Sequence, residues 1–124
     1  MSANLDQFEG EKYLSLQTFR KNGMPVDTPV WFAKDGDRFY VYSLANAGKV
    51  KRIRNNPRVN VIPCDIRGNT KGEWVEANAR IVGKPEAERA HNLLNQKYGL
   101  MKRIGGLFSK LMGRERTTIA IEFG

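Results

Sequence analysis

The residues with the clearest chemical potential lie in one stretch of the chain, residues 39–59. Ser43 lies near the end of an alternating run that is typical of a β-strand, and Lys49 follows it by six residues at the start of a short helical segment. A hydroxyl group, free backbone N–H groups at a helix start and a lysine ammonium are the parts of a phosphate or other anion site. The sequence therefore predicts an anion site here. The alternative is a solvated basic helix that only keeps the protein soluble.

A short helix has to position these groups. We expect Asn46 to cap this helix and Gly48 to lie in its first turn. Pro57 should end it, because proline disfavours helical geometry in the residue before it. Val50 and Ile53 lie three apart, so one side of the helix can face a core. The rest of the helix surface is basic and carries Lys49, Lys51, Arg52 and Arg54.

The remaining chain is mainly β. Alternating apolar and polar residues predict six strands, and Asn22-Gly23 and Asp35-Gly36-Asp37 are hairpin turn signals. Pro29 has no N–H group, so its strand should lie at an edge, at a bulge or where the sheet opens to a ligand. Hairpins make neighbouring strands antiparallel, and a small barrel hides the edges of such a sheet. The strands are expected over residues 13–21, 25–34, 38–43, 58–66, 73–82 and 116–123.

A second helix should begin at Pro85 and carry an apolar stripe as far as Tyr98. Gly99 is expected to end or kink it. Residues 100–112 also carry apolar residues at helical spacing, mixed with basic ones. We interpret this stretch as a helical flap packed on the barrel, with a membrane-surface helix as the alternative.

Length and composition indicate one domain over residues 1–124, with a formal net charge of +8 that favours anionic partners. A core of this size has little surplus stability, so a dimer would help. The polar start predicts no secretory signal, no apolar run could span a bilayer, and the single cysteine, Cys64, is consistent with the cytoplasm. With one histidine, His91, and one cysteine, the sequence predicts neither a metal site nor a catalytic constellation.

Several of these motifs occur together in one known family. A hydroxyl residue six before a lysine, an apolar helical turn, Asn-Asn-Pro and a valine-rich strand resemble the flavin-phosphate segment of the pyridoxamine 5′-phosphate oxidase-like split-barrel flavoproteins. Residues 29–32 and 63–65 strengthen the likeness, which is closer still to the branch that uses the deazaflavin coenzyme F-420. The resemblance implies a homodimeric, antiparallel, six-stranded split β-barrel. It also implies an oxidoreductase that transfers hydride between FMN or coenzyme F-420 and a small organic substrate.

The resemblance also assigns roles to residues. The segment from Thr28 to Trp31 would run along the flavin ring, where backbone groups bond the heteroatoms of the ring. Ser43 and Lys49 would grip the phosphate, and Gly48 stands where relatives often carry a second basic residue. The cofactor-binding residues implied in this way are Thr28, Pro29, Val30, Trp31, Tyr42, Ser43, Gly48, Lys49, Val50 and Arg54.

Two other functions stay open. A flavin-fold protein could bind or carry a ligand without turnover. A small basic barrel could also bind nucleic acid, with Tyr40 and Tyr42 on one strand face stacking on bases. Trp31 and Trp74, expected on strands, are interpreted as core or dimer-interface aromatics.

Overall fold

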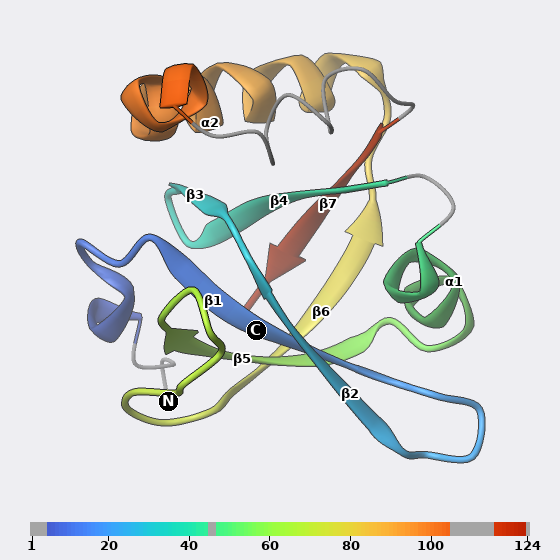
Figure 1. Ribbon diagram of the computed structural model, residues 1–124. Coiled ribbons are helices and arrows are strands. Elements are labelled where there is room, and N and C mark those ends of the chain that lie inside the picture. The colour runs from blue at the N-terminus through green and yellow to red at the C-terminus, as the bar shows by residue number, and fades with distance from the viewer. Residues whose placement is uncertain (1–4, 45–46, 105–115, 124) are drawn as a thin grey trace.

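The computed structural model describes residues 5–44, 47–104 and 116–123, which form a curled antiparallel sheet with two α-helices (Figure 1). The expected mainly-β fold with helices is confirmed. In chain order the elements are η1 (a 3-10 turn, Asp6–Phe8), β1 (Tyr13–Phe19), β2 (Pro25–Val30), β3 (Phe32–Asp35), β4 (Arg38–Leu44), α1 (Gly48–Asn55), β5 (Arg58–Cys64), β6 (Val75–Ile81), α2 (Lys84–Ile104) and β7 (Arg116–Glu122).

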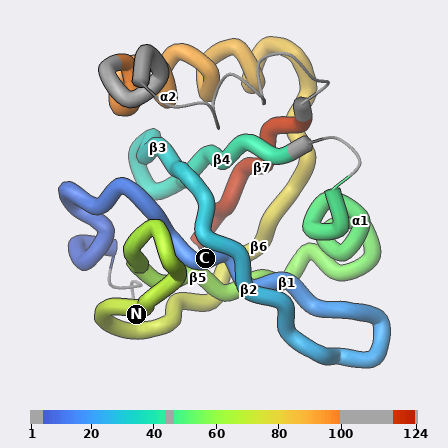
Figure 2. Tube along the Cα trace, in the orientation of Figure 1, coloured from blue at the N-terminus to red at the C-terminus, as the bar shows by residue number. Residues whose placement is uncertain are grey.

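The sheet has seven strands in the order β2-β1-β5-β6-β7-β4-β3, and every neighbouring pair is antiparallel. Its two edge strands, β2 and β3, are successive parts of one chain segment. Figures 1 and 2 show this segment crossing from one edge of the sheet to the other. The sheet therefore curls into a barrel that is split between its edges.

The expectation of one strand over residues 25–34, and hence of six strands in all, is wrong. The chain breaks at Trp31, because Val30 pairs with Leu14 of β1 whereas Phe32 pairs with Val41 of β4. Those partner strands lie near opposite edges of the sheet, so one continuous strand cannot serve both. The expected edge position of Pro29 is confirmed, since β2 ends the sheet.

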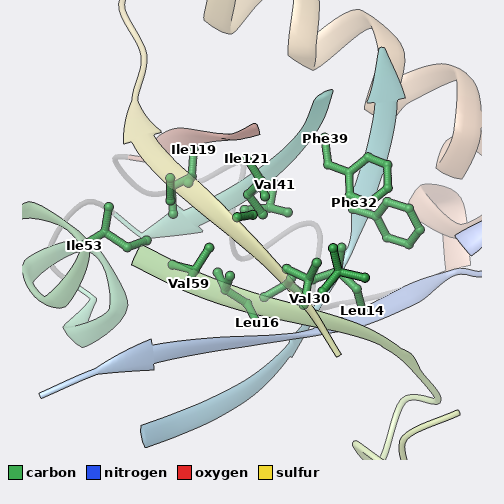
Figure 3. Close-up of a cluster of buried hydrophobic side chains, with 14 of the residues drawn as sticks. Leu14, Leu16, Val30, Phe32, Phe39, Val41, Ile53, Val59, Ile119 and Ile121 are labelled. Atoms are coloured by element: carbon green, nitrogen blue, oxygen red, sulfur yellow. The ribbon is translucent and has the colours of Figure 1, made fainter. Parts of the chain in front are cut away.

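The interior of the curled sheet is a single apolar core (Figure 3). Phe8 of η1 packs into it, with its ring centroid 5.0 Å from that of Phe39 in an edge-to-face contact. Val50 and Ile53 of α1 enter the same core, as their spacing predicted. Strand residues supply most of the rest, among them Leu14, Leu16, Val41, Val59, Val61, Ile119 and Ile121.

The helix α2 covers the outer face of β3, β4 and β7 (Figure 1). Tyr40 and Tyr42 point to that face and are only 0% and 7% exposed beneath the helix. They therefore offer no surface on which bases could stack. The nucleic-acid-binding hypothesis thus loses the observation that supported it most. The helix is kinked at Tyr98 (φ −113°, ψ 15°), one residue before the glycine that predicted a kink.

The stretch over residues 100–112 is only partly described. Its first part continues α2 as far as Ile104, and residues 105–112 lie outside the described residues. Among the helices that the structure does describe, none is both long and apolar enough to cross a membrane.

Candidate anion and cofactor site

The helix α1 begins without a polar cap. The expected N-cap, Asn46, lies outside the described residues, and the N-cap position belongs instead to Ala47, whose extended backbone (φ −65°, ψ 150°) precedes the first helical residue. The Ala47 carbonyl accepts hydrogen bonds from the backbone N–H groups of Val50 (3.1 Å) and Lys51 (3.4 Å). The amide of Val50 is therefore already used, and its side chain is buried in the core.

Two cations lie side by side on α1. Lys49 and Arg52 are three residues apart, a spacing that places side chains on the same side of a helix. Burial lowers the pKa of Lys49, and the positive charge of Arg52 lowers it further. No carboxylate of the described residues lies within ion-pair distance of either side chain. This corner of the barrel therefore carries two adjacent positive charges with no counter-charge from the described part of the chain.

The guanidinium of Arg52 is held in a defined place. Its Nε donates a hydrogen bond of 2.7 Å to Oγ1 of Thr18, a β1 side chain that is 1% exposed. Its Nη1 lies directly over Gly48, where a Cβ atom would come within 2.7 Å of that nitrogen. The guanidinium thus occupies the space that a side chain at position 48 would need.

The position of Arg54 differs from that of Arg52. Arg54 is exposed and lies five residues after Lys49, which turns it about 140° around the helix. The sequence analysis chose Arg54 for the cofactor site and left Arg52 out. The signal that could have found Arg52 is its spacing of three residues from Lys49 and four from Gly48.

Tyr42 and Ser43 point to opposite faces of β4. Ser43 is 2% exposed and pairs with Thr117 of β7. It lies near the end of β4, and β4 packs against α1. The Tyr42 ring packs beneath α2, and its hydroxyl lies 2.5 Å from Nδ1 of His91. The side chain of Ser43 can therefore face the α1 corner, whereas that of Tyr42 faces α2.

Most of the segment expected along a flavin ring lies on the edge strand β2, which pairs with β1, the strand whose Thr18 binds Arg52. Thr18 pairs with Val26 of β2, and the next rung on the same face joins Leu16 to Thr28. Thr28 therefore lies about 7 Å along β2 from the rung that anchors Arg52. Because β2 is an edge strand, its outer backbone groups are not used for pairing within the sheet. The Val30 side chain is buried, so that residue can meet a ligand only through its backbone.

The two tryptophans were expected on strands, but both lie directly beside strands instead. Trp31 sits at the break between β2 and β3, and its ring stacks on that of Tyr98. Trp74 immediately precedes β6 and is 42% exposed. Trp31 therefore packs within the chain, whereas the Trp74 side chain is partly exposed to solvent.

One group that the sequence did not single out lies on α2. The Nζ of Lys97 sits 3.5 Å from the centroid of the Phe32 ring and donates a 2.8 Å hydrogen bond to the Phe32 carbonyl oxygen. Burial of this ammonium lowers the pKa of Lys97 to about 8. The side chain lines a recess of about 380 Å³, and a second recess of about 560 Å³ includes His91. Neither recess is lined by a residue expected to bind cofactor.

Cys64 is 1% exposed, and burial followed by the charge of Asp65 raises the pKa of its thiol to about 11. It is therefore a neutral, small apolar residue, as its sequence context predicted. Within the described ranges, no group of three or more His, Cys, Asp or Glu residues could hold a metal ion.

Comparisons with known proteins agree with this architecture. A family model described as pyridoxamine 5′-phosphate oxidase matches residues 1–122. HutZ, a heme storage protein from Vibrio cholerae, is 17% identical with a TM-score of 0.68, over 96% of this chain and 86% of that one. An FAD-binding protein from Mesorhizobium loti is 17% identical with a TM-score of 0.64, over 95% and 83%. The conserved hypothetical protein Rv2991 from Mycobacterium tuberculosis is 21% identical with a TM-score of 0.66, over 93% and 74%. Among curated proteins, none matches the sequence.

Proposed function

The chain belongs to the pyridoxamine 5′-phosphate oxidase family, as its motifs predicted, and on that premise we propose that it is a flavin- or deazaflavin-dependent oxidoreductase. It binds FMN or coenzyme F-420 and transfers hydride between that cofactor and a small organic substrate. The observation that carries this proposal is the pair of cations Lys49 and Arg52, for which the described residues supply no counter-charge. Arg52 is bonded to β1, the strand that pairs with the edge strand β2.

The donors present suit a phosphorylated cofactor. A lysine ammonium and an arginine guanidinium each form charge-assisted hydrogen bonds with phosphate oxygens. Ser43 lies one residue before the end of β4, which packs against the same helix. The outer edge of β2 from Thr28 to Val30, with Trp31 directly after it, offers backbone groups to the polar edge of a ring system. The phosphate end and the ring end of one cofactor would thus lie on neighbouring parts of β1, β2 and α1.

A bound flavin or deazaflavin supplies the hydride chemistry itself. This chain has to bind the phosphate, orient the ring along β2 and limit the access of water. None of these tasks needs a side-chain acid, base or nucleophile, which agrees with a sequence that predicts no catalytic residue. Thr28, Pro29, Val30, Trp31, Tyr42, Ser43, Gly48, Lys49 and Val50 stay the residues proposed from the resemblance, with side-chain contacts from Lys49 best supported. Arg54 stays proposed for the polyglutamate tail of coenzyme F-420 and not for the phosphate of FMN, because it lies on another side of α1 from Lys49.

The active protein is proposed to be a homodimer. The cofactor surface described above is an open edge rather than an enclosed cavity, so a second subunit is needed to cover the ring. Ile66 and Trp74, at 66% and 42% exposure, flank the loop that approaches Pro29, where a Cβ atom on Gly68 would lie 3.7 Å from the proline Cγ. Light scattering at micromolar concentration should give twice 14.1 kDa, and a monomer of 14.1 kDa would count against the dimer.

The choice between FMN and coenzyme F-420 depends on charge. FMN carries one phosphate group, whereas coenzyme F-420 has a phosphodiester and a polyglutamate tail that would reach more of the basic surface of α1. Salt screens such contacts over about 8 Å at physiological ionic strength. Affinity for coenzyme F-420 should therefore fall more steeply with salt than affinity for FMN. Equal salt dependence would mean that the side chains of Lys51, Arg52 and Arg54 do not contact the tail.

The decisive experiment is a spectrum of the purified protein, followed by titration with each cofactor. Bound FMN gives two visible absorption bands, and the deazaflavin gives one near the violet edge. A protein that takes up neither cofactor would refute the proposed function. A protein that binds one of them but shows no hydride transfer to a panel of unsaturated and quinone-like acceptors would instead be a ligand carrier, the second candidate.

A further inference from the structure

We propose that Arg52 is a phosphate-binding residue of this site, held in place by Thr18 and admitted by the missing side chain of Gly48. The inference rests on the proposed function and extends it, since it gives the site a second cation and hence a preference for a phosphate monoester dianion. It assigns a phosphate-binding role to Arg52 and a positioning role to Thr18, and neither residue was among the cofactor-binding residues implied by the resemblance.

The first support is the way in which the guanidinium is bonded. An arginine side chain has five N–H donors, one on Nε and four on the two terminal nitrogens. Thr18 accepts the Nε–H bond at 2.7 Å, and its own side chain is almost fully buried. The bond therefore fixes the plane of the guanidinium and leaves the terminal nitrogens to bind an anion. A planar fork of this kind matches two oxygens of one phosphate group.

The second support is the role of Gly48. Its φ is not positive, so the backbone there does not require glycine. What the structure uses is the absence of a Cβ atom, because that atom would lie 2.7 Å from Arg52 Nη1. Arg52 thus brings a positive charge to the place where the family resemblance expects a basic side chain at position 48. The charge comes from the next turn of the same helix.

The third support is electrostatic. Lys49 and Arg52 are near enough for the arginine charge to lower the pKa of the lysine, and no described carboxylate lies within ion-pair distance of either. Two like charges held together without an acidic partner cost free energy in the free protein. A bound dianion removes this repulsion and adds its own attraction to both groups, so it should bind better than a monoanion.

The test compares FMN with riboflavin, which lacks the phosphate, by fluorescence titration of the parent and two variants. Arg52→Met keeps an unbranched side chain that matches the aliphatic part of arginine and removes the charge, and Arg54→Met is the matched control on the other side of α1. We expect Arg52→Met to weaken FMN binding by about 10- to 150-fold, with riboflavin affinity unchanged. Arg54→Met should change FMN affinity by less than about threefold.

Two further variants test the geometry. Thr18→Val keeps the charge of Arg52 but releases Nε, so FMN affinity should fall less than in Arg52→Met. The double variant Gly48→Arg with Arg52→Met places a cation directly at position 48 and should recover most of the lost affinity. Thermal melts of all variants show whether each one is folded.

The outcomes separate the two proposals. If Arg52→Met melts like the parent and binds FMN as tightly, while Lys49→Met loses affinity, the role of Arg52 is wrong and the proposed function stands. Equal losses for FMN and riboflavin in Arg52→Met would also overturn it, because the effect would not involve the phosphate. If the parent itself binds neither FMN nor coenzyme F-420, both proposals fail. If it binds only coenzyme F-420, whose phosphodiester carries a single charge, the preference for a dianion is wrong. The same variants are then titrated with coenzyme F-420, and unchanged affinity in Arg52→Met overturns the role of Arg52 as well.

Discussion

The rings of Trp31 and Tyr98 lie face to face, with their centroids 4.4 Å apart and their planes 3° from parallel. This stack joins the break between β2 and β3 to the kink in α2. The Tyr98 hydroxyl accepts the N–H of Phe32 at 3.0 Å and lies 2.8 Å from the carbonyl oxygens of Phe32 and Lys12. One side chain thus ties together the helix, β3 and the chain entering β1.

Replacing Tyr98 by phenylalanine should lower the free energy of unfolding by about 1–3 kcal/mol, because the buried backbone groups of Phe32 would lose a partner. Urea denaturation of the variant and the parent measures the difference. Tyr98→Leu should cost more, since it also removes the stack on Trp31. A Tyr98→Phe variant as stable as the parent would show that the hydroxyl contributes nothing to holding this junction.

Lys49→Ala should lose cofactor without losing the fold. A charge-assisted bond to phosphate is worth about 1.5–3 kcal/mol, which corresponds to roughly 10- to 150-fold in the dissociation constant. No described residue forms an ion pair with Lys49, so the free energy of unfolding should change by no more than about 0.5 kcal/mol. Titration with FMN and a thermal melt check both statements. Lys51→Ala is the exposed control for FMN, because Lys51 is proposed to contact only the tail of coenzyme F-420. Unchanged affinity in Lys49→Ala would refute the phosphate assignment of α1.

Gly48→Ala should separate stability from binding. Alanine favours the helix over glycine by up to about 1 kcal/mol, and the backbone at this position suits either residue. The new methyl group would push the flexible end of Arg52 away from Thr18, because the two cannot share the space. The variant should melt slightly above the parent and bind FMN about 5- to 10-fold more weakly, a loss of roughly 1–1.4 kcal/mol. Full affinity would show that the position of Arg52 does not matter.

The contacts at the start of α2 should make the free energy of unfolding decrease as the pH becomes acidic. Glu86 accepts hydrogen bonds from Arg80 at 2.8 and 2.7 Å and from the Tyr40 hydroxyl at 2.8 Å. These bonds, that from Arg80 foremost, lower the pKa of Glu86 from its ordinary value of 4.5, and Arg80 likewise lowers the pKa of Glu122. A carboxylate with a lowered pKa stabilises the fold above its ordinary pKa. That stabilisation is lost as the pH falls through the lowered value.

The measurement is urea denaturation of Glu86→Gln and the parent across this pH range. At neutral pH the variant should be less stable by about 1 kcal/mol, a value reduced for the partial exposure of the pair. The difference should shrink as the pH falls below 4.5, where the parent gains the proton that glutamine imitates. A difference that is independent of pH would mean that the ion pair does not cause the effect.

Much of the local structure could be predicted because its signals are local. The turn at Gly23 (φ 86°) and the turn at Gly36 (φ 64°) have the positive φ values that their sequences indicated. The alternation around Tyr40 and Tyr42 correctly predicted opposite faces for successive residues. It could not predict that α2 buries the second face, because that helix begins about forty residues later in the chain.

The break at Trp31 and the site at Arg52 depend on contacts between distant parts of the chain. The alternation in residues 25–34 is compatible with one strand or with two. Only the closure of the sheet, which places β2 and β3 at opposite edges, decides that two strands form. Helical spacing groups Arg52 with Lys49, but the bond to Thr18 joins residues 34 positions apart. The family resemblance supplied the phosphate segment and the place of Lys49, and the structure supplied the second cation.

The place of β7 in the sheet has a consequence for the growing polypeptide. This last strand lies between β6 and β4, and it pairs with both along most of its length. Before it is synthesised, the ribosome-bound chain has one hairpin formed by β3 and β4 and a separate group formed by β2, β1, β5 and β6. Each exposes a strand edge with unpaired amide groups, and such edges are prone to aggregate. Closure of the sheet therefore has to wait until β7 has left the exit tunnel. Because β7 pairs with strands that lie far from it in the sequence, we expect the sheet to close slowly.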